Sequence, residues 1–496
     1  MTTYQTDNVP VSITKFGGGL NTASGPLNLQ DNESSDLFDV DFDKFGSVKQ
    51  RNGYTILNSS PIAQTQTALG LYWYQTATAQ KAIAVSGGKV YKMDSLDGTW
   101  DDITGVALTT GGAYEVDFVT FNGKVLFTDD IGTPQQWANA GTCSNMTVVS
   151  GLTQARFIKI FQNFCLMANT VVSGVDNPTR FYWSSIKDET EWNAADFLEV
   201  GFNDGYEITG MKVLGKRLII YKTNAIYIVS FTGDANIPFV IDKSNSSVGC
   251  ISHWSIQEVD NGHVFLGYDG LYYFDGSNSY KVSDRINDTI RGLNRQELQT
   301  AKSAYQKDKN RYWLSVKDGT SSYNNLVITW DSFNNSFSRY SMSASALAIF
   351  TVNAREERLY FRDALGYTYR GDIGSDDYPA NTKTAINSYF WTNWKSFQDI
   401  ADRKGVPHIY LYYSKTNADL TFAYAWDFDT TDQYSATINM NSGDSVGASA
   451  SANHLSQRRD LTGRGRVVRF KFAMNKTTSS YQIDGLGIQT HLQTKT

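Results

Sequence analysis

The chain contains few of the residues on which most reactive or disulfide-stabilised proteins depend. Its 496 residues include only three cysteines, five histidines and eight prolines. The cysteines Cys143, Cys165 and Cys250 lie far apart, which argues against a disulfide framework and indicates assembly in a reducing compartment. Long apolar runs are also missing, and none approaches the roughly 18 residues that a membrane span requires. We therefore expect no membrane insertion, and the polar, acidic start Met1–Asp7 argues against Sec-type export.

An excess of basic residues is lacking as well. The chain has 44 Lys and Arg against 50 Asp and Glu, a net charge of −6 and a pI near 5.5. Its surface as a whole is therefore not expected to bind nucleic acid or an anionic membrane.

Recognisable catalytic and metal-binding motifs are missing too. The histidines are solitary, without HxH or HExxH spacing, and no GxSxG or Rossmann fingerprint occurs. Cys165 lies in an apolar run where nothing nearby would lower its pKa, so it is expected to be a buried strand residue. The segment "SLDGTW" (95–100) resembles an incomplete sialidase Asp box, which is a turn element and is not repeated here. We predict no catalytic, cofactor-binding or metal residue; a propeller glycoside hydrolase stays open because any two of the 50 acids can meet in the fold.

What the sequence does contain is the composition of a β protein. Aromatic residues make up 14% of the chain, and Gly, Asn, Asp, Ser and Thr cluster between short apolar runs. From residue 69 a unit recurs in which two strands flank a tight turn and a polar loop follows. The predicted first turns lie near Gly88, Gly123, Asn163, Gly215, Gly262, Asn310 and Glu357. Their spacing of roughly 35 to 52 residues is typical of propeller blades, and about seven units are visible.

The pattern predicts an all-β chain of three parts. Residues 1–60 form an extended N-terminal arm with the first strands, 61–375 an irregular β-propeller and 385–496 a β-sandwich with alternating strands. The Gly-, Asp- and Pro-rich stretch 371–384 is expected to be a linker. One short amphipathic helix is predicted over 283–294, with Ser283 as N-cap and Ile286, Ile290 and Leu293 on its apolar face.

The segment 16–54 has three possible interpretations: a metal-binding loop, a phosphate-binding loop or a β-strand. Asp39, Asp41 and Asp43 have the spacing that begins a calcium loop, but Lys44 and Gln50 stand where an EF-hand needs Gly and Glu. The glycines at 17–19 lack the lysine, the preceding strand and the following helix of a P-loop. Alternation with Val40 and Phe42 favours a half-buried strand whose carboxylates lie on the wet face.

The same segment resembles the N-terminal signature of a family of tailed-bacteriophage virion proteins, the tail nozzle or packaged-DNA stabilisation proteins. The resemblance extends through "ITGMKVLGKRLIIYKTNAIYIVSF" and "FLGYDGLYYFDG" to about residue 345 and is loose in the sandwich. The matching positions include Gly18, Gly19, Leu20, Asn21, Asp39, Val40, Asp41, Phe42, Gly46, Lys49, Arg51, Gly53 and Tyr54.

The resemblance implies a non-enzymatic virion protein of the tail, assembled in the host cytoplasm. It implies a ring, expected to be a hexamer, that lies below the head-to-tail adaptor, continues the DNA channel and helps to retain the genome until ejection. The implied partners are the adaptor, a tail fibre or tailspike, and passing double-stranded DNA without sequence specificity. A propeller glycoside hydrolase, a carbohydrate-binding tail module and a structural subunit elsewhere in the tail remain the alternatives, because a fold alone does not prove a function.

Two segments are candidates for contacts with partners. The arm motif Gly18, Gly19, Leu20, Asn21, Asp39, Asp41 and Arg51 would direct assembly, with residues 1–35 folding along the body or onto a neighbouring subunit; a frayed terminus is the alternative. The second is a basic run that stands out in an acidic chain, comprising Arg458, Arg459, Arg464, Arg466, Arg469 and Lys471. It would contact an acidic partner or DNA phosphates, or else protect the edge of a sheet from pairing.

Overall fold

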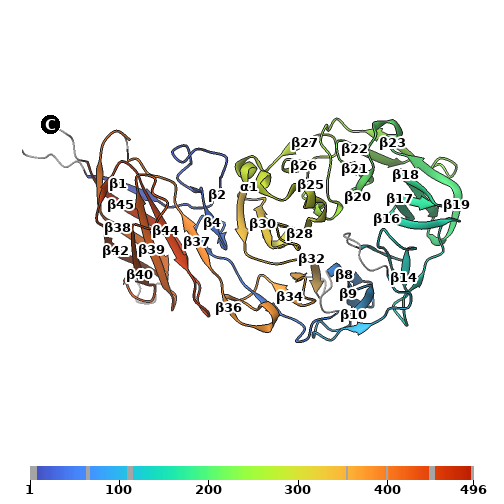
Figure 1. Cartoon of the computed structure of the whole chain (residues 1–496), viewed down its shortest axis with the longest axis horizontal. Coiled ribbons are helices and arrows are strands. Elements are labelled where there is room, and N and C mark those ends of the chain that lie inside the picture. The colour runs from blue at the N-terminus through green and yellow to red at the C-terminus, as the bar shows by residue number, and fades with distance from the viewer. Residues whose placement is uncertain are drawn as a thin grey trace, which may run out of the picture.

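The computed structural model describes residues 8–62, 68–108, 116–352, 356–397, 400–445 and 453–492. Its described residues form a ring of small sheets beside a two-layered sandwich (Figure 1). In that part of the chain, no helix has the length and apolar character that a membrane crossing requires. The predicted all-β class, with a propeller and a sandwich, is confirmed.

Seven antiparallel four-stranded sheets form the blades of the propeller. Blades 1 to 3 consist of β8 (Ala68–Gln75), β9 (Gln80–Ser86), β10 (Lys89–Met93) and β11 (Asp101–Asp102); β12 (Asp117–Phe121), β13 (Lys124–Thr128), β14 (Gln135–Trp137) and β15 (Ser144–Asn145); and β16 (Leu152–Phe161), β17 (Phe164–Val172), β18 (Val175–Ser185) and β19 (Asp188–Glu199). Blades 4 to 6 consist of β20 (Ile208–Leu214), β21 (Arg217–Lys222), β22 (Ile226–Phe231) and β23 (Phe239–Lys243); β24 (Gln257–Val259), β25 (Gly262–Leu266), β26 (Leu271–Phe274) and β27 (Ser279–Lys281); and β28 (Lys302–Gln306), β29 (Arg311–Val316), β30 (Leu326–Asp331) and β31 (Ser336–Tyr340).

Blade 7 is assembled from two distant parts of the chain. It combines β32 (Ala346–Val352), β33 (Glu356–Arg362) and β34 (Thr368–Gly371) with β7 (Tyr54–Ile56), which pairs with β34 as the outermost strand. Tyr54 packs edge-on against Phe361 and Tyr369 with ring centroids 5.1 Å away in both cases. The propeller therefore starts before the expected boundary at residue 61, because a strand of the N-terminal segment closes its ring.

The predicted first turns mark real hairpins in most blades. Gly123, Asn163, Gly215 and Asn310 all have positive φ at the turn between the first and second strands. Asparagine and glycine tolerate this conformation, so they end one strand and start the next. In blade 1, Gly88 instead lies between the second and third strands. The hairpin that the sequence pattern predicts there consists of β9 and β10, and β8 precedes it as the first strand of the blade.

The sandwich consists of an eight-stranded and a five-stranded sheet (Figure 1). The larger sheet contains β1 (Asn8–Ile13), β5 (Val40–Phe42), β6 (Val48–Gln50), β38 (Lys404–Ser414), β41 (Asp444–Ser445), β42 (His454–Asp460), β43 (Arg464–Gly465) and β45 (Gln482–Leu492). The smaller contains β4 (Leu37–Phe38), β37 (Ser388–Trp391), β39 (Asp419–Trp426), β40 (Tyr434–Asn439) and β44 (Val468–Met474). The N-terminal segment thus supplies strands to both sheets, so it is part of this domain.

Two short sheets and seven short helices complete the described elements. The sheets pair β2 (Gly19–Leu20) with β3 (Glu33–Ser34) and β35 (Asp376–Asp377) with β36 (Thr384–Ala385). The helices are η1 (Phe202–Asp204), η2 (His253–Ser255), η3 (Asp284–Ile286), α1 (Asn287–Gly292), η4 (Arg295–Thr300), η5 (Lys307–Lys309) and η6 (Pro379–Asn381).

The predicted amphipathic helix is present as η3 followed by α1. Ile286, Ile290 and Leu293 are all buried, as their spacing indicates. Ser283 stands at the N-cap position of η3, as predicted, but it makes no side-chain cap bond, and its Oγ instead accepts the Leu271 backbone N–H at 2.9 Å. That hydroxyl therefore ties the helix to blade 5.

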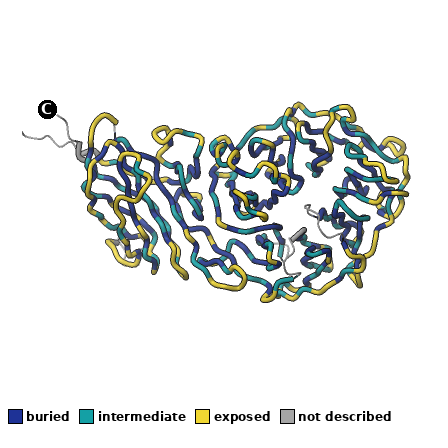
Figure 2. Tube along the Cα trace, viewed as in Figure 1, coloured by how far each residue is buried: buried dark blue, intermediate teal, exposed yellow. Residues whose placement is uncertain are grey.

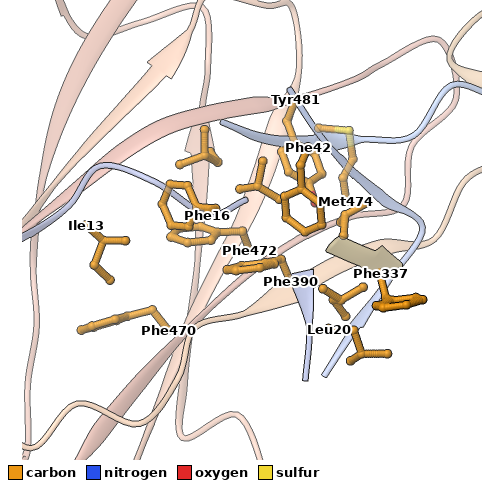
Figure 3. Packing of buried hydrophobic residues seen from close by; sticks show 14 of the residues in the cluster. Ile13, Phe16, Leu20, Phe42, Phe337, Phe390, Phe470, Phe472, Met474 and Tyr481 are labelled. Atoms are coloured by element: carbon orange, nitrogen blue, oxygen red, sulfur yellow. The ribbon is translucent and has the colours of Figure 1, made fainter. Parts of the chain in front are cut away.

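The N-terminal segment fills the space between the sandwich and the propeller. Ile13, Phe16 and Leu20 are almost fully buried, and Phe16 packs edge-on against Phe390 with ring centroids 5.6 Å apart. Figure 3 shows these side chains among aromatic residues of the sandwich, with Phe337 of blade 6 close to Leu20. One cluster of buried apolar side chains continues from blades 5 and 6 into the sandwich, and exposed positions concentrate in the loops (Figure 2).

Candidate functional site

The glycine turn of the predicted assembly motif presses the N-terminal segment against blade 6. Gly19 has φ +72°, and a Cβ placed on it would lie 2.7 Å from the backbone nitrogen of Phe337. Leu20 is fully buried, and Asn21 donates from Nδ2 to Glu33 Oε2 at 3.0 Å. Glycine is required at position 19 because any side chain would meet backbone at that contact.

Arg51 is the centre of a buried charge network at the same junction. Its Nε donates to Asp39 Oδ1 at 2.5 Å, while Nη1 and Nη2 bond the two carboxylate oxygens of Asp377 at 2.9 and 2.7 Å. Burial opposes its charge, but the two carboxylates outweigh that cost and hold the pKa of Arg51 above its ordinary value. Such a two-pronged contact fixes orientation as well as distance. Residues 371–384 are therefore not a free linker, since Asp377 within them is held by the arm.

A second buried ion pair lies beside the first. Arg311, at the start of β29, contacts Asp41 Oδ1 through Nη2 at 2.5 Å. Burial again disfavours the charge on Arg311, but the attraction of the Asp41 carboxylate outweighs burial and raises the pKa of the guanidinium. The pair joins the sandwich strand β5 to blade 6 of the propeller.

These contacts correct the expectation that the carboxylates of 39–43 lie on a wet face. The strand is only Val40–Phe42; Asp39 precedes it with φ +54° and is fully buried, and Asp41 is 7% exposed. The alternation rule fails because both faces of this short strand are covered, one by the sandwich and one by the propeller. Asp39 and Asp41 are tolerated there because each meets an arginine, whereas Asp43 follows the strand and is only half-buried.

The basic run does not form a single site. Arg458 and Arg459 lie on β42 and Arg464 on β43, both in the eight-stranded sheet, whereas Arg469 and Lys471 lie on β44 in the five-stranded sheet. Arg458, Arg464 and Arg466 are exposed, and Arg458 pairs with Asp460 at 2.9 Å.

Arg469 and Lys471 instead cover aromatic rings. The guanidinium of Arg469 lies 3.9 Å from the ring centroid of Trp391 and 4.7 Å from that of Trp394. Lys471 lies 5.1 Å from the Trp391 ring and pairs with Asp432 at 3.1 Å. Protection of a sheet edge does not explain these two residues, because β44 pairs with β37 on one side and β39 on the other. Along Arg458 and Arg459 the described residues show pairing with β38 only, so edge protection still applies there.

The three cysteine thiols are buried and are not activated. Burial raises the pKa of Cys143 and of Cys250 to about 12, and it also raises the pKa of Cys165, so none is an activated thiolate. Among the residues that the structure describes, no group of three or more His, Cys, Asp and Glu side chains is placed to hold a metal ion.

Several junction residues could not be found from the sequence. Arg311 and Asp377 lie 270 and 326 residues from their partners in the N-terminal segment, and neither belongs to a recognisable motif. Ser341, whose backbone N–H donates to Asp39 at 3.0 Å, is equally inconspicuous. Only the fold brings them to the motif.

The chain thus consists of two β domains, a seven-bladed propeller and a sandwich, that are joined through buried ion pairs. The chain belongs to the family described as "Bacteriophage P22 Gp10, beta-propeller", whose model matches residues 50–328, more than half of the chain. It is therefore a structural protein of a bacteriophage virion, as the resemblance of its N-terminal segment predicts.

No curated protein matches the sequence. Solved structures that match the chain include the computationally designed Ika8 protein (10% identity, 64% of this chain and 99% of that chain, TM-score 0.38) and YCF48 from Cyanidioschyzon merolae (11%, 64% and 98%, TM-score 0.40). PorZ of Porphyromonas gingivalis is similar over 71% of this chain and 44% of that chain, at 12% identity and TM-score 0.38. At such scores these similarities carry no argument about fold or function.

Proposed function

We propose that the protein forms a ring, a nozzle or stopper, below the head-to-tail adaptor of a phage tail. The ring, a homo-oligomer of six copies, continues the DNA channel and helps to retain the packaged genome until ejection. The family match over residues 50–328 is the observation that carries this proposal. The adaptor and a tail fibre or tailspike are its protein neighbours.

The junction between the domains supports a role in which the subunit withstands mechanical force. Two arginines, each buried with its carboxylate partners, connect the sandwich to the propeller, and an apolar cluster runs across the same boundary. A subunit joined in this way resists bending between its domains, because separating them would leave charges buried without partners. Pressure from packaged DNA can then be transmitted through the subunit to its neighbours.

The charge of the chain suits a conduit for DNA. Each phosphate that a protein neutralises adds affinity through counterion release, with a slope of about −0.9 in log salt, so a densely basic lining would hold DNA in place. With 50 acidic against 44 basic residues, the chain has no excess of positive charge with which to bind DNA tightly. Retention then depends on the integrity of the ring and on a narrow constriction rather than on tight binding.

The experiment compares particles assembled with and without the protein. We expect particles without it to lose their DNA or to be uninfectious, and supplying the protein in trans should restore both properties. Class averages of complete tails should show six-fold symmetry at its position. Full, stable and infectious particles in its absence would refute the retention role.

The free protein provides a second measurement. It should bind random-sequence duplex only weakly at about 150 mM salt and should release no sugar from host glycans. Nanomolar affinity for duplex would overturn the sliding-channel account, and glycan turnover would favour a hydrolase.

A further inference from the structure

A groove of about 700 Å³ lies at one end of blade 3, between the first half of β18 and the loop that leads from β19 to β20. Its two walls come from short segments, residues 175–180 and 199–207, and both lie wholly within the described part of the chain. The volume falls in the range of about 300–1,000 Å³ that is usual for ligand pockets. Blade 3 lies at the end of the molecule opposite the sandwich, so the groove is remote from the junction between the domains (Figure 1).

The groove exists because blade 3 is longer than the other blades. Its four strands have 10, 9, 11 and 12 residues, whereas the longest described strand of any other blade has 8. The first six residues of β18 include none that is buried, and Val175 at its start is 61% exposed. The additional length therefore contributes little to the core and instead forms a surface.

The loop that forms the second wall is held in place by blade 4. Asp204 in this loop accepts hydrogen bonds from Lys222 Nζ at 2.7 Å and from Tyr227 Oη at 3.0 Å. Lys222 is fully buried and also donates to the carbonyl of Gly201 at 3.0 Å. Gly201 has φ +53°, and a Cβ placed on it would lie 2.3 Å from Tyr227 Oη. The backbone of the loop is thus fixed by contacts within the chain, so a ligand does not have to order it.

This fixed loop presents aromatic rings to solvent. Phe202 is 70% exposed and Tyr206 is 43% exposed, and both line the groove together with Val175 of the first wall. A single exposed apolar side chain is ordinary, but three around one groove on a rigid backbone are typical of a binding site. An aromatic ring offers a flat apolar surface, and the C–H groups on one face of a pyranose ring pack against such a surface.

Two carboxylates of the groove are available as hydrogen-bond acceptors. Asp176 is exposed, and its carboxylate has no ion pair within the described part of the chain. Glu207 accepts from Arg156 Nη1 at 3.1 Å and from Asn169 Nδ2 at 3.2 Å, and its side chain is still half exposed. An ionised carboxylate has room for about four donors, so both groups can accept further bonds from sugar hydroxyls.

The one cation among the described lining residues is already engaged. Arg180 donates from Nε to Glu199 Oε1 at 2.7 Å and from Nη1 to Tyr182 Oη at 3.0 Å. Its guanidinium also lies 3.8 Å from the centroid of the Phe197 ring. An anionic ligand would therefore meet the carboxylates of the groove while this guanidinium serves Glu199. Because like charges oppose each other at such a contact, a neutral ligand fits the groove best.

We propose that the groove of blade 3 binds a neutral glycan, with a sugar ring stacked on Phe202 and its hydroxyls donating to Asp176 and Glu207. Stacking and hydrogen bonds select carbohydrate, and the carboxylates disfavour nucleic acid and acidic sugars. The proposal concerns binding without cleavage. It goes beyond the proposed ring, since the site lies within one subunit.

The test measures the binding of sugars to the purified full-length chain. The probes are the methyl glycosides of glucose, galactose, mannose, rhamnose and N-acetylglucosamine, together with maltose, cellobiose and lactose. Saturation-transfer NMR and calorimetry should show saturable binding of at least one of these neutral probes. Glucuronic acid and sialic acid should bind at least tenfold more weakly than the best neutral probe. Because the measurement uses the free chain, its outcome does not depend on whether the protein forms a ring in the tail.

Phe202→Ala is the decisive variant and Phe333→Ala its matched control. Phe333 is 71% exposed in the turn that follows β30 and does not line the groove, so both variants remove a ring of almost equal exposure. Both variants should fold, because neither ring lies in the core, and their unfolding curves check this. We expect Phe202→Ala to weaken binding at least tenfold and Phe333→Ala to change it less than twofold. Phe202→Tyr, which keeps the ring, should retain binding.

Absence of saturable binding of every neutral probe, or equal binding by a folded Phe202→Ala, would overturn the proposal. Incorporation of the variants into tails tests a different occupant, a neighbouring protein of the virion. Loss of incorporation by Phe202→Ala, with no sugar bound by the wild type, would assign the groove to that neighbour and refute the glycan site.

Discussion

Asp41 and Arg311 form a buried ion pair that spans 270 residues of sequence and joins the two domains of the chain. Asp41 belongs to a short strand of the sandwich, and Arg311 begins the second strand of blade 6. Together with Arg51 and its two carboxylates, the pair makes the N-terminal segment the connection between propeller and sandwich.

Arg51→Met should destabilise the protein by about 3–5 kcal/mol, because it leaves the carboxylates of Asp39 and Asp377 buried without their cation. Denaturant unfolding of the free protein measures the loss. Arg458→Met is the control: its pair with Asp460 is largely exposed and should contribute less than about 1 kcal/mol. Equal effects of the two substitutions would show that the buried network does not hold the junction.

Phe16→Ala should cost about 3–5 kcal/mol, because its fully buried ring packs in the sandwich core. Phe45→Ala, at a ring 74% exposed, should change stability by less than about 0.5 kcal/mol.

Because Phe16 and its neighbours belong to the core, deleting residues 1–35 should unfold the sandwich rather than leave an intact monomer with a missing arm. A truncated chain with wild-type unfolding behaviour would contradict the assignment of this segment to the core.

Gly19→Ala should destabilise the protein by more than about 2 kcal/mol. The substitution adds left-handed strain of about 1–2 kcal/mol and places a methyl group against the backbone of Phe337. Gly123→Ala isolates the first contribution, because Gly123 has φ +76° and no atom within 4 Å of its ideal Cβ. If thermal unfolding shifts equally for the two variants, close packing at residue 19 is not what requires glycine.

Lys212 should give stability a distinct dependence on pH. Its pKa is about 8 in the folded chain and near 10.5 when unfolded, so between these values the unfolded state binds more protons. The penalty for burying its charge is therefore fully present below pH 8 and is relieved as the pH rises toward 10.5. The difference between the wild-type and Lys212→Met unfolding curves should show this rise, whereas a difference independent of pH would place the lysine in solvent.

The exposed arginines of the basic run should act in assembly rather than in folding. Replacing Arg458, Arg464 and Arg466 by Gln should leave unfolding unchanged within about 0.5 kcal/mol, lower incorporation into tails and make that loss steeper with salt. Arg469→Gln should instead destabilise the free protein, because the guanidinium covers Trp391 and Trp394. Normal incorporation of the triple variant at every salt concentration would end the assembly hypothesis.

The periodic features of this fold could be predicted from the sequence, because they depend on neighbouring residues. Turns at Gly123, Asn163 and Asn310 have the left-handed backbone that their residue types favour, and Ile286 and Ile290 are buried as their helical spacing requires. Local rules determine such positions, so the blades and the helix are visible in the pattern.

The junction could not be predicted, because it depends on segments that meet only in the folded chain. Asp39 and Asp41 alternate with apolar residues as in a strand with one wet face, yet a second domain covers that face. The basic run illustrates the same limit, since adjacency in sequence gave no sign that Arg458 and Lys471 belong to different sheets. Whether these residues contact a partner stays a prediction.

The pairing of the first described strand with the last one orders events while the chain is being made. β1 (Asn8–Ile13) pairs along its whole length with β45 (Gln482–Leu492), so it has no partner until β45 has been translated. At about 5–20 residues per second, the nascent chain carries Ile13 and Phe16 without their core for on the order of half a minute to a minute and a half. Over that interval the ribosome-bound chain exposes an unpaired strand and apolar side chains. Chaperones recognise this combination, and it leads to aggregation when many copies are made at once. The larger sheet of the sandwich therefore cannot be completed before β45 has been synthesised.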